Sequence, residues 1–195
     1  MIIHDKQAIF YHIPKNAGST VKYMLGQYGI DLEFIKMPYI NDNNRLINTV
    51  ADYTDKYISG HEECKDYFKF TFLRDPIDRL ISGWKYKGQD KEFDDFVYNL
   101  DNEKDNGMIW HSRISQFTQL NSKIEDMDFI GHVNYFEDHF NKLLEIMDLP
   151  KKEIVKRNKS QLKRKLHIDD NLRKYIEKKY KTDYNIMDFV NADKF

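Results

Sequence analysis

The chain has 195 residues, of which 41% are hydrophobic and 14% aromatic, which is enough for one domain with a substantial core. Its 31 basic and 32 acidic residues nearly cancel, no apolar run approaches the roughly 20 residues that span a bilayer, and residues 1–10 carry no signal-peptide pattern. This composition argues against a disordered chain and a membrane-spanning protein, and the single cysteine excludes an internal disulfide and fits a reducing cytosol.

Hydrophobic periodicity predicts a series of alternating strands and helices. The predicted strands are 7–13, 32–37, 57–61, 68–73 and 129–133, and the predicted helices are 19–28, 44–53, 76–86, 93–100, 135–147 and 170–180. Residues 101–128 show no clear pattern. Such alternation favours an α/β fold, in which a central, mainly parallel sheet is flanked by helices on both faces. We expect one domain over residues 1–195 and a cytoplasmic location.

A strand, a turn with a glycine and a helix follow one another in the segment AIFYHIPKNAGSTVKYML, residues 8–25. The first N–H groups of a helix have no partner within it and can bind an anion. Gly18 permits close approach, Ser19 and Thr20 add hydroxyl groups, and Lys15 adds a positive charge. The alternative is an ordinary helix start beside a solvent-exposed lysine. The Walker pattern is absent, because this lysine precedes the glycine by three positions.

A second strand-to-helix junction occurs in FTFLRDPIDRLISGW, residues 70–84. Arg74 is predicted at the carboxyl end of a strand, where open α/β sheets bind ligands. Ser82 lies eight residues later, two turns into a helix that we expect to begin after Asp75. An arginine and a serine so placed can hold a second phosphate. The alternative is a local ion pair of Arg74 with Asp75, with Arg79 merely on the helix surface.

Together the two motifs resemble those of sulfotransferases that use 3′-phosphoadenosine-5′-phosphosulfate (PAPS), and are most similar to the heparan sulfate 2-O branch. The resemblance implies a three-layer P-loop-like fold and PAPS as the co-substrate. In that family the first loop holds the 5′-phosphosulfate, and the second motif holds the 3′-phosphate through residues that match Arg74 and Ser82. The first loop corresponds here to Lys15, Asn16, Ala17, Gly18, Ser19 and Thr20.

Residues 151–181 carry 13 Lys or Arg and 4 Asp or Glu, a local charge of +9, so the rest of the chain carries −10. Such a stretch is either the solvated face of a lysine-rich helix or an anion site. Within it, the segment RNKS resembles the family loop that closes over the nucleotide. The resemblance implies nucleotide contacts by Arg157, Lys159 and Ser160.

Two catalytic roles are predicted. A lysine aimed at the leaving oxygen stabilises the transition state of sulfuryl transfer, and Lys15 fits this role. The acceptor hydroxyl needs a base with a pKa near neutral. His61 is the candidate, because the resembling branch has its catalytic histidine in a similar Gly-His segment, and because we expect it at the same sheet edge as Arg74. Glu62 is a substitute base, and His12 is interpreted as inward-facing and structural.

The acceptor is expected to be a carbohydrate or small molecule, and the chain shows no pattern for a metal site. Tyr39, Trp84, Tyr86 and Trp110 are either candidates for stacking on an acceptor ring or core residues. A kinase would need a Walker lysine before Ser or Thr, which is missing. A nucleic-acid-binding protein would need exposed aromatic residues among its basic ones, and residues 151–174 contain none. A degenerate sulfotransferase that only binds nucleotide stays open.

Overall fold

The computed structural model describes residues 1–35, 49–87, 89–101, 113–155 and 166–193. Its sheet has the strand order β1–β2–β3–β4. The strands are β1 (Ile2–Ile3), β2 (Ala8–Phe10), β3 (Phe68–Leu73) and β4 (Phe129–His132). The last three run parallel, and β1 is antiparallel to β2. The predicted α/β class with a mainly parallel sheet is therefore confirmed.

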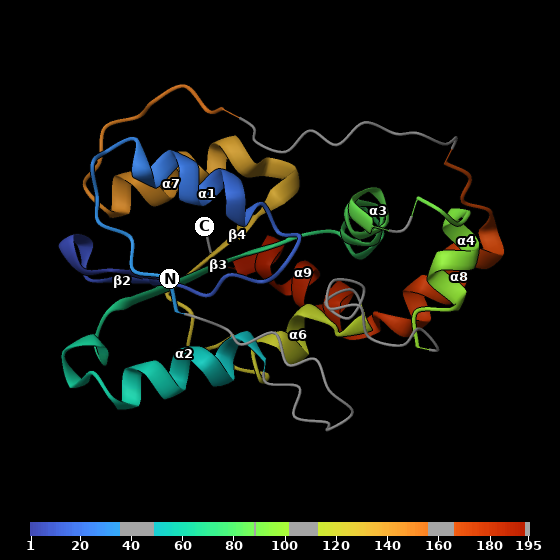
Figure 1. The fold of residues 1–195 in the computed structure, drawn as a ribbon, viewed down its shortest axis with the longest axis horizontal. Coiled ribbons are helices and arrows are strands. Elements are labelled where there is room, and N and C mark those ends of the chain that lie inside the picture. The colour runs from blue at the N-terminus through green and yellow to red at the C-terminus, as the bar shows by residue number, and fades with distance from the viewer. Residues whose placement is uncertain (36–48, 88, 102–112, 156–165, 194–195) are drawn as a thin grey trace.

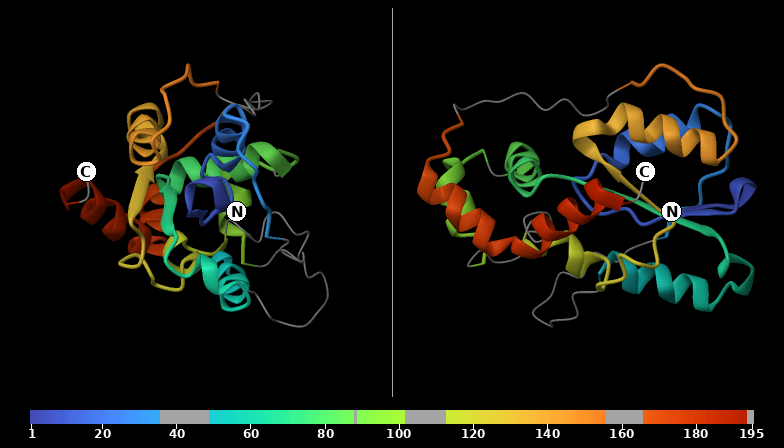
Figure 2. Two further views of the ribbon diagram at one scale, coloured as in Figure 1. Left: turned by 90° about the vertical axis from the view of Figure 1, so that its left-hand side faces the viewer. Right: turned by 180° about the vertical axis from the view of Figure 1, so that it is seen from behind.

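Helices cover both faces of the sheet (Figure 1). On one face lie α1 (Gly18–Gly26) and α7 (Phe136–Ile146), and on the other lie α2 (Val50–Ser59) and α6 (Gln116–Gln119). Beyond the carboxyl ends of the strands lie α3 (Pro76–Lys87), α4 (Phe93–Tyr98) and α8 (Asp170–Lys179), while α9 (Lys181–Asp193) leads back to the sheet (Figures 1 and 2). Short 3₁₀ turns occur at His4–Lys6, Glu62–Cys64 and Val133–Tyr135.

The sequence of β3 explains the layers. Alternate residues of a strand point to opposite faces. Phe70 and Phe72 therefore pack with α1 and α7 in one core cluster, and Leu73 packs on the other face with Val50 of α2. A third cluster joins α3, α4 and α8 around Trp84. This third cluster fixes α3 at the carboxyl edge of the sheet.

Several predicted elements are confirmed with small shifts of their ends: β2, α1, β3, α3, α4, β4, α7 and α8. The predicted helix 44–53 begins later, at Val50, because Thr49 and Asp52 form a capping box there. The strand predicted at 32–37 is only an isolated bridge between Ile2 and Glu33 within the described residues.

The strand predicted at 57–61 is wrong. Residues 57–59 are the last residues of α2, and Gly60 caps that helix. The helix α9 was not predicted, because the sequence was interpreted as ending its last helix at Tyr180. Tyr180, Tyr184 and Met187 have helical spacing, and this signal could have revealed α9.

Candidate functional site

The segments that follow β2 and β3 lie next to each other at the carboxyl edge of the sheet. Phe10 pairs with Phe70 in the parallel register, and the Tyr11 amide donates to the Phe70 carbonyl at 2.9 Å. The chain then turns into α1 after β2 and into α3 after β3 (Figure 1). Because open α/β sheets bind their ligands at this edge, the two predicted motifs share one candidate site.

The turn between β2 and α1 contains two non-glycine residues in the left-handed region. Lys15 has a φ of 72° and Ala17 a φ of 61°. Each such residue costs on the order of 1–3 kcal/mol, and such strain gathers at ligand-binding turns. Left-handed residues in a turn direct successive N–H groups into a concavity that suits an anion. The backbone of this turn therefore has the form of an anion site.

The first turn of α1 is open to such an anion. Ala17 is the N-cap residue, and no side chain caps this end. Ser19 is exposed there, and Thr20 is buried. Gly18 is required for space, because a Cβ atom at this position would lie 1.9 Å from Nε2 of His12. His12 is exposed, so its interpretation as inward-facing is wrong, although its ring does pack against the glycine.

Two cationic side chains meet in this turn. The Arg74 guanidinium donates from Nη1 to the Lys15 carbonyl at 3.1 Å, and Arg74 Nε is buried without a hydrogen-bond partner. Lys15 Nζ lies 4.4 Å from the centroid of the Tyr86 ring. Burial and the nearby Arg74 lower the pKa of Lys15, and burial lowers the pKa of Arg74. A bound anion would relieve the cost of holding both charges here.

Asn16 is 1% exposed and ties the turn to the sheet. Its Nδ2 donates to the Phe72 carbonyl at 2.7 Å and to Gln116 Oε1 at 2.6 Å. Its Oδ1 is buried without a hydrogen-bond partner. Asn16 therefore connects the turn to β3 and to α6 through buried hydrogen bonds.

Sequence reasoning missed the two residues that complete this support. The side-chain oxygen of Gln116 in α6 also accepts from the Arg74 backbone amide at 2.8 Å. The buried Asp183 of α9 accepts from the Gln116 backbone amide at 3.0 Å. No local signal could have found Gln116, because its partners lie 42 and 100 positions away in the chain.

The interpretation of Arg79 as a residue on the surface of α3 is wrong. Arg79 is 2% exposed, and its guanidinium donates to the carbonyls of Pro14 at 3.3 Å and Ile114 at 2.7 Å. Asp75 caps α3 as predicted, since its Oδ1 accepts from the Asp78 amide at 3.1 Å. Ser82 is half-buried in α3, two turns beyond this cap.

The structure does not bring His61 to this site. His61 Nδ1 lies 2.9 Å from the Tyr57 carbonyl, and its ring stacks on Tyr57 at 4.0 Å between centroids. Tyr57 in turn donates to Glu33, whose carboxylate pairs with His4 just before β2 begins. His61 thus lies at the amino edge of the parallel strands, beside the end of α2 that is far from α3 in Figure 1. The expectation that His61 shares an edge with Arg74 is wrong, and so is a placement of Glu62 beside the site, since it lies in the next turn.

The remaining predicted residues divide into three groups. Arg157, Lys159 and Ser160 lie outside the described residues, so their contacts with a nucleotide stay a prediction; Tyr39 and Trp110 also lie outside them. Trp84 is fully buried in the third core cluster, and its Nε1 donates to the Lys91 carbonyl at 3.0 Å, so it is not available for an acceptor. Tyr86 is 55% exposed beside Lys15 and stays a candidate.

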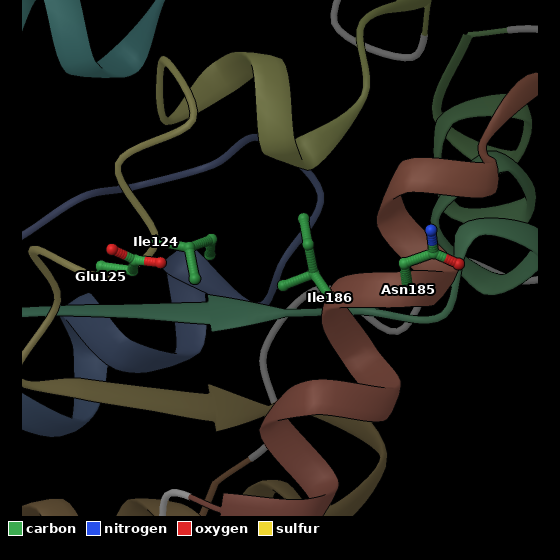
Figure 3. A pocket seen from close by; sticks show the side chains of 4 residues that line it. All are labelled: Ile124, Glu125, Asn185 and Ile186. Atoms are coloured by element: carbon green, nitrogen blue, oxygen red, sulfur yellow. The ribbon is translucent and has the colours of Figure 1, made fainter.

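A separate hollow of about 210 Å³ lies between α9 and the segment before β4 (Figure 3). Ile124, Glu125, Asn185 and Ile186 line it, and none of the predicted site residues does. Because Ile124 and Ile186 belong to the core cluster on the α2 face, the hollow is a surface extension of that core.

A model of the sulfotransferase family matches residues 1–190. The chain belongs to the sulfotransferase family. The match covers both motifs, every described strand and the buried network around Gln116, and it assigns the α/β sheet to the P-loop-like class of this family. No match was found among curated proteins or among solved structures.

Within the described ranges, no helix is long and apolar enough to cross a membrane. The same ranges contain no cluster of three or more His, Cys, Asp or Glu side chains that could hold a metal ion. Independence from a metal stays a prediction from the sequence.

Proposed function

We propose that this sulfotransferase takes its sulfuryl group from PAPS and transfers it to a hydroxyl group of a carbohydrate or small molecule. The observation that carries the proposal is the contact of the Arg74 guanidinium with the strained turn that contains Lys15, with an unpartnered Arg74 Nε. PAPS has anionic groups on both its 5′ and 3′ sides. We expect these groups to bind at the start of α1 and at the β3–α3 junction.

The donor set suits this nucleotide. Lys15, the open first turn of α1 and the hydroxyls of Ser19 and Thr20 would hold the phosphosulfate. Arg74 and Ser82 would hold the 3′-phosphate, since charge-assisted bonds from arginine favour phosphate oxygens. The missing Cβ atom of Gly18 leaves room for the ring of His12, which packs against the start of α1.

The chemistry follows from the charge on these groups. When bound, PAPS supplies the sulfuryl group and departs as 3′,5′-phosphoadenosine (PAP). Lys15 stabilises the negative charge that develops on the leaving oxygen, and a donor that acts mainly in the transition state raises the rate more than the affinity. Burial of Lys15 strengthens this interaction, because the local dielectric constant is lower than that of water.

The acceptor class is supported by the motifs and by one exposed ring. The motif pair resembles that of the carbohydrate branch, and Tyr86 offers an exposed aromatic face beside Lys15. Aromatic faces of this kind pack on the apolar faces of sugars and on phenols. A cytoplasmic location stays a prediction.

Nucleotide selectivity tests the proposal. The chain should bind PAP more tightly than AMP, because only PAP has a 3′-phosphate for Arg74. Charge-assisted hydrogen bonds contribute about 1.5–3 kcal/mol each, so Arg74→Ala should weaken PAP about tenfold or more and weaken AMP less, through the lost contact with the Lys15 carbonyl alone. The Arg74→Lys variant keeps the charge but loses the planar guanidinium group. Its affinity for PAP should therefore lie between those of the parent and Arg74→Ala.

Isothermal calorimetry on the three proteins gives these affinities. Equal affinity of the parent for PAP and AMP would contradict the assignment. Transfer of labelled sulfate from PAPS to a panel of sugars and phenols then separates an active enzyme from a degenerate one.

A further inference from the structure

The side chain of Gln116 joins the two halves of the candidate site. Its Oε1 accepts from Asn16 Nδ2 at 2.6 Å and from the Arg74 amide at 2.8 Å. Its Nε2 donates to the Arg74 carbonyl at 2.8 Å. One amide group therefore holds the turn after β2 and both backbone polar groups of the residue that follows β3.

A glutamine is needed for this set of contacts. A side-chain amide has two acceptor positions on its oxygen and two N–H donors. In Gln116 all four are in use, because Nε2 also donates to Asp183 Oδ2 at 3.3 Å. A glutamate lacks the donors, and an apolar residue lacks both kinds of group. At 1% exposure, water has little access to replace a lost contact.

Gln116 is itself held from α9. Asp183 accepts from the backbone amides of Gln116 at 3.0 Å and of Phe117 at 3.1 Å, and it is 1% exposed. Burial raises the pKa of Asp183 and the buried Arg79 opposes this effect, while Arg79 also donates to the carbonyl of Pro14 at the start of the turn. Asp183 thus holds Gln116 in place, and Arg79 holds the start of the same turn.

We propose that Gln116 is a positioning residue that sets the spacing between the anion site at Lys15 and the anion site at Arg74. This inference rests on the proposed PAPS site. PAP contacts both sites through its two phosphates, whereas AMP contacts only the first. Loss of the spacing therefore reduces the preference for PAP over AMP, while a general loss of stability would weaken both ligands alike.

Gln119 provides a matched control on the same helix. It is also a glutamine with 1% exposure, and its Oε1 accepts from the Val50 amide at 3.2 Å on α2. Replacing either residue removes a buried amide of equal size. Only Gln116 contacts the segments at Asn16 and Arg74.

The test compares Gln116→Ala, Gln116→Met and Gln119→Ala by calorimetry with PAP and AMP. The methionine fills the space of the glutamine, so this variant guards against a failure to fold. Both Gln116 variants should lower the ratio of PAP to AMP affinity by about tenfold, since a buried partner group is left unsatisfied. Gln119→Ala should keep the parental ratio. An unchanged ratio in Gln116→Met, or an equal fall in Gln119→Ala, would overturn the proposal.

Hydrogen exchange of the nucleotide-free protein separates this inference from the proposed function. The Arg74 amide is protected by Gln116 Oε1, so it should exchange at least about tenfold faster in Gln116→Met than in Gln119→Ala. If the parent does not distinguish PAP from AMP, the proposed nucleotide is wrong, and the exchange of Arg74 still tests the link. If Arg74 exchanges equally in both variants, Gln116 does not hold this segment.

Discussion

Lys15 combines a strained backbone, a partly buried charge and a neighbouring cation. Its φ of 72° directs the turn, and its ammonium group rests on the exposed ring of Tyr86. Burial and Arg74 both lower the pKa of this group, so the folded chain bears a cost to keep it charged here. A site that binds anions explains the cost, because the same groups then stabilise a ligand.

Lys15→Ala should therefore lower kcat by roughly 10²–10³ and weaken PAP far less, because charge on the leaving oxygen is largest in the transition state. Initial rates with PAPS and calorimetry with PAP measure the two effects separately. Lys22→Ala is the control, since Lys22 Nζ also lies over a ring, 4.1 Å from the centroid of Phe34, but sits within α1 beyond its first turn. Normal turnover with poor PAP affinity would make Lys15 a binding residue only.

His61 shows how an error in one element changes the interpretation of a residue. A Gly-His segment at this spacing was expected to end a strand and so to face the site. The segment instead ends α2, and the 3₁₀ turn Glu62–Cys64 leads from there to the amino end of β3. His61 stacks on Tyr57 and lies near Glu33, and these contacts indicate a structural role rather than a catalytic one.

Strands and helices with a strong apolar pattern were predictable from the sequence. FKFTFL has apolar residues on both faces and is β3, and residues 136–146 have the apolar spacing of α7. Residues 57–61 also contain an apolar run, but they continue a helix that Thr49 and Asp52 begin. A short apolar run is compatible with a strand or with a helix. Here the capping box that begins eight residues earlier favours the helix.

The packing between β3 and β4 leads to a prediction for stability. Gly131 pairs with Phe72 across the two strands, and a Cβ atom at residue 131 would lie 2.3 Å from the Phe72 ring. Phe72 is fully buried and packs on Phe136, so its ring has little room to move. Gly131→Ala should lower the free energy of unfolding by about 1–3 kcal/mol, the usual cost of overpacking.

Gly26→Ala is the control for this substitution. Gly26 is the last residue of α1, and a Cβ atom there would meet nothing within 4 Å. This variant should be neutral or more stable by up to about 1 kcal/mol, because alanine favours the helix. Urea denaturation of both variants measures the difference, and a Gly131→Ala protein as stable as the parent would show that the strands can separate to admit the methyl group.

The motifs of the candidate site were predictable from the sequence, but the residues that support them were not. Lys15, Arg74 and their neighbours follow strands that the sequence marks clearly. Gln116 and Asp183 come from segments without a motif, and their contacts with the turn depend on how α6 and α9 pack under the sheet. Long-range polar contacts of this kind have no local signature, because each partner alone is an ordinary polar residue.

The buried amino terminus leads to a prediction about the pH dependence of global stability. The Met1 amine donates to the Phe10 carbonyl at 3.0 Å, and burial lowers its pKa from 8.0 to about 5, against a smaller opposing effect of Glu33. Between these two values the unfolded chain holds a proton that the folded chain has released. Stability therefore rises with pH over this window, by up to about 4 kcal/mol for three pKa units. Below pH 5 both states are charged, and the folded state bears the full desolvation cost.

Other groups add to this dependence and define the control. Burial lowers the pKa of His132 and of His139, which also raises stability as the pH increases, whereas burial raises the pKa of Asp183 and acts in the opposite direction. A chain with an acetylated amino terminus keeps these three groups and loses only the amine. Urea denaturation from pH 5.5 to 8.5 should give a steeper rise for the free chain than for the acetylated one. The comparison uses slopes, since the acetyl group itself can change stability at every pH, and equal slopes would show that the amine titrates in the folded protein as it does in water.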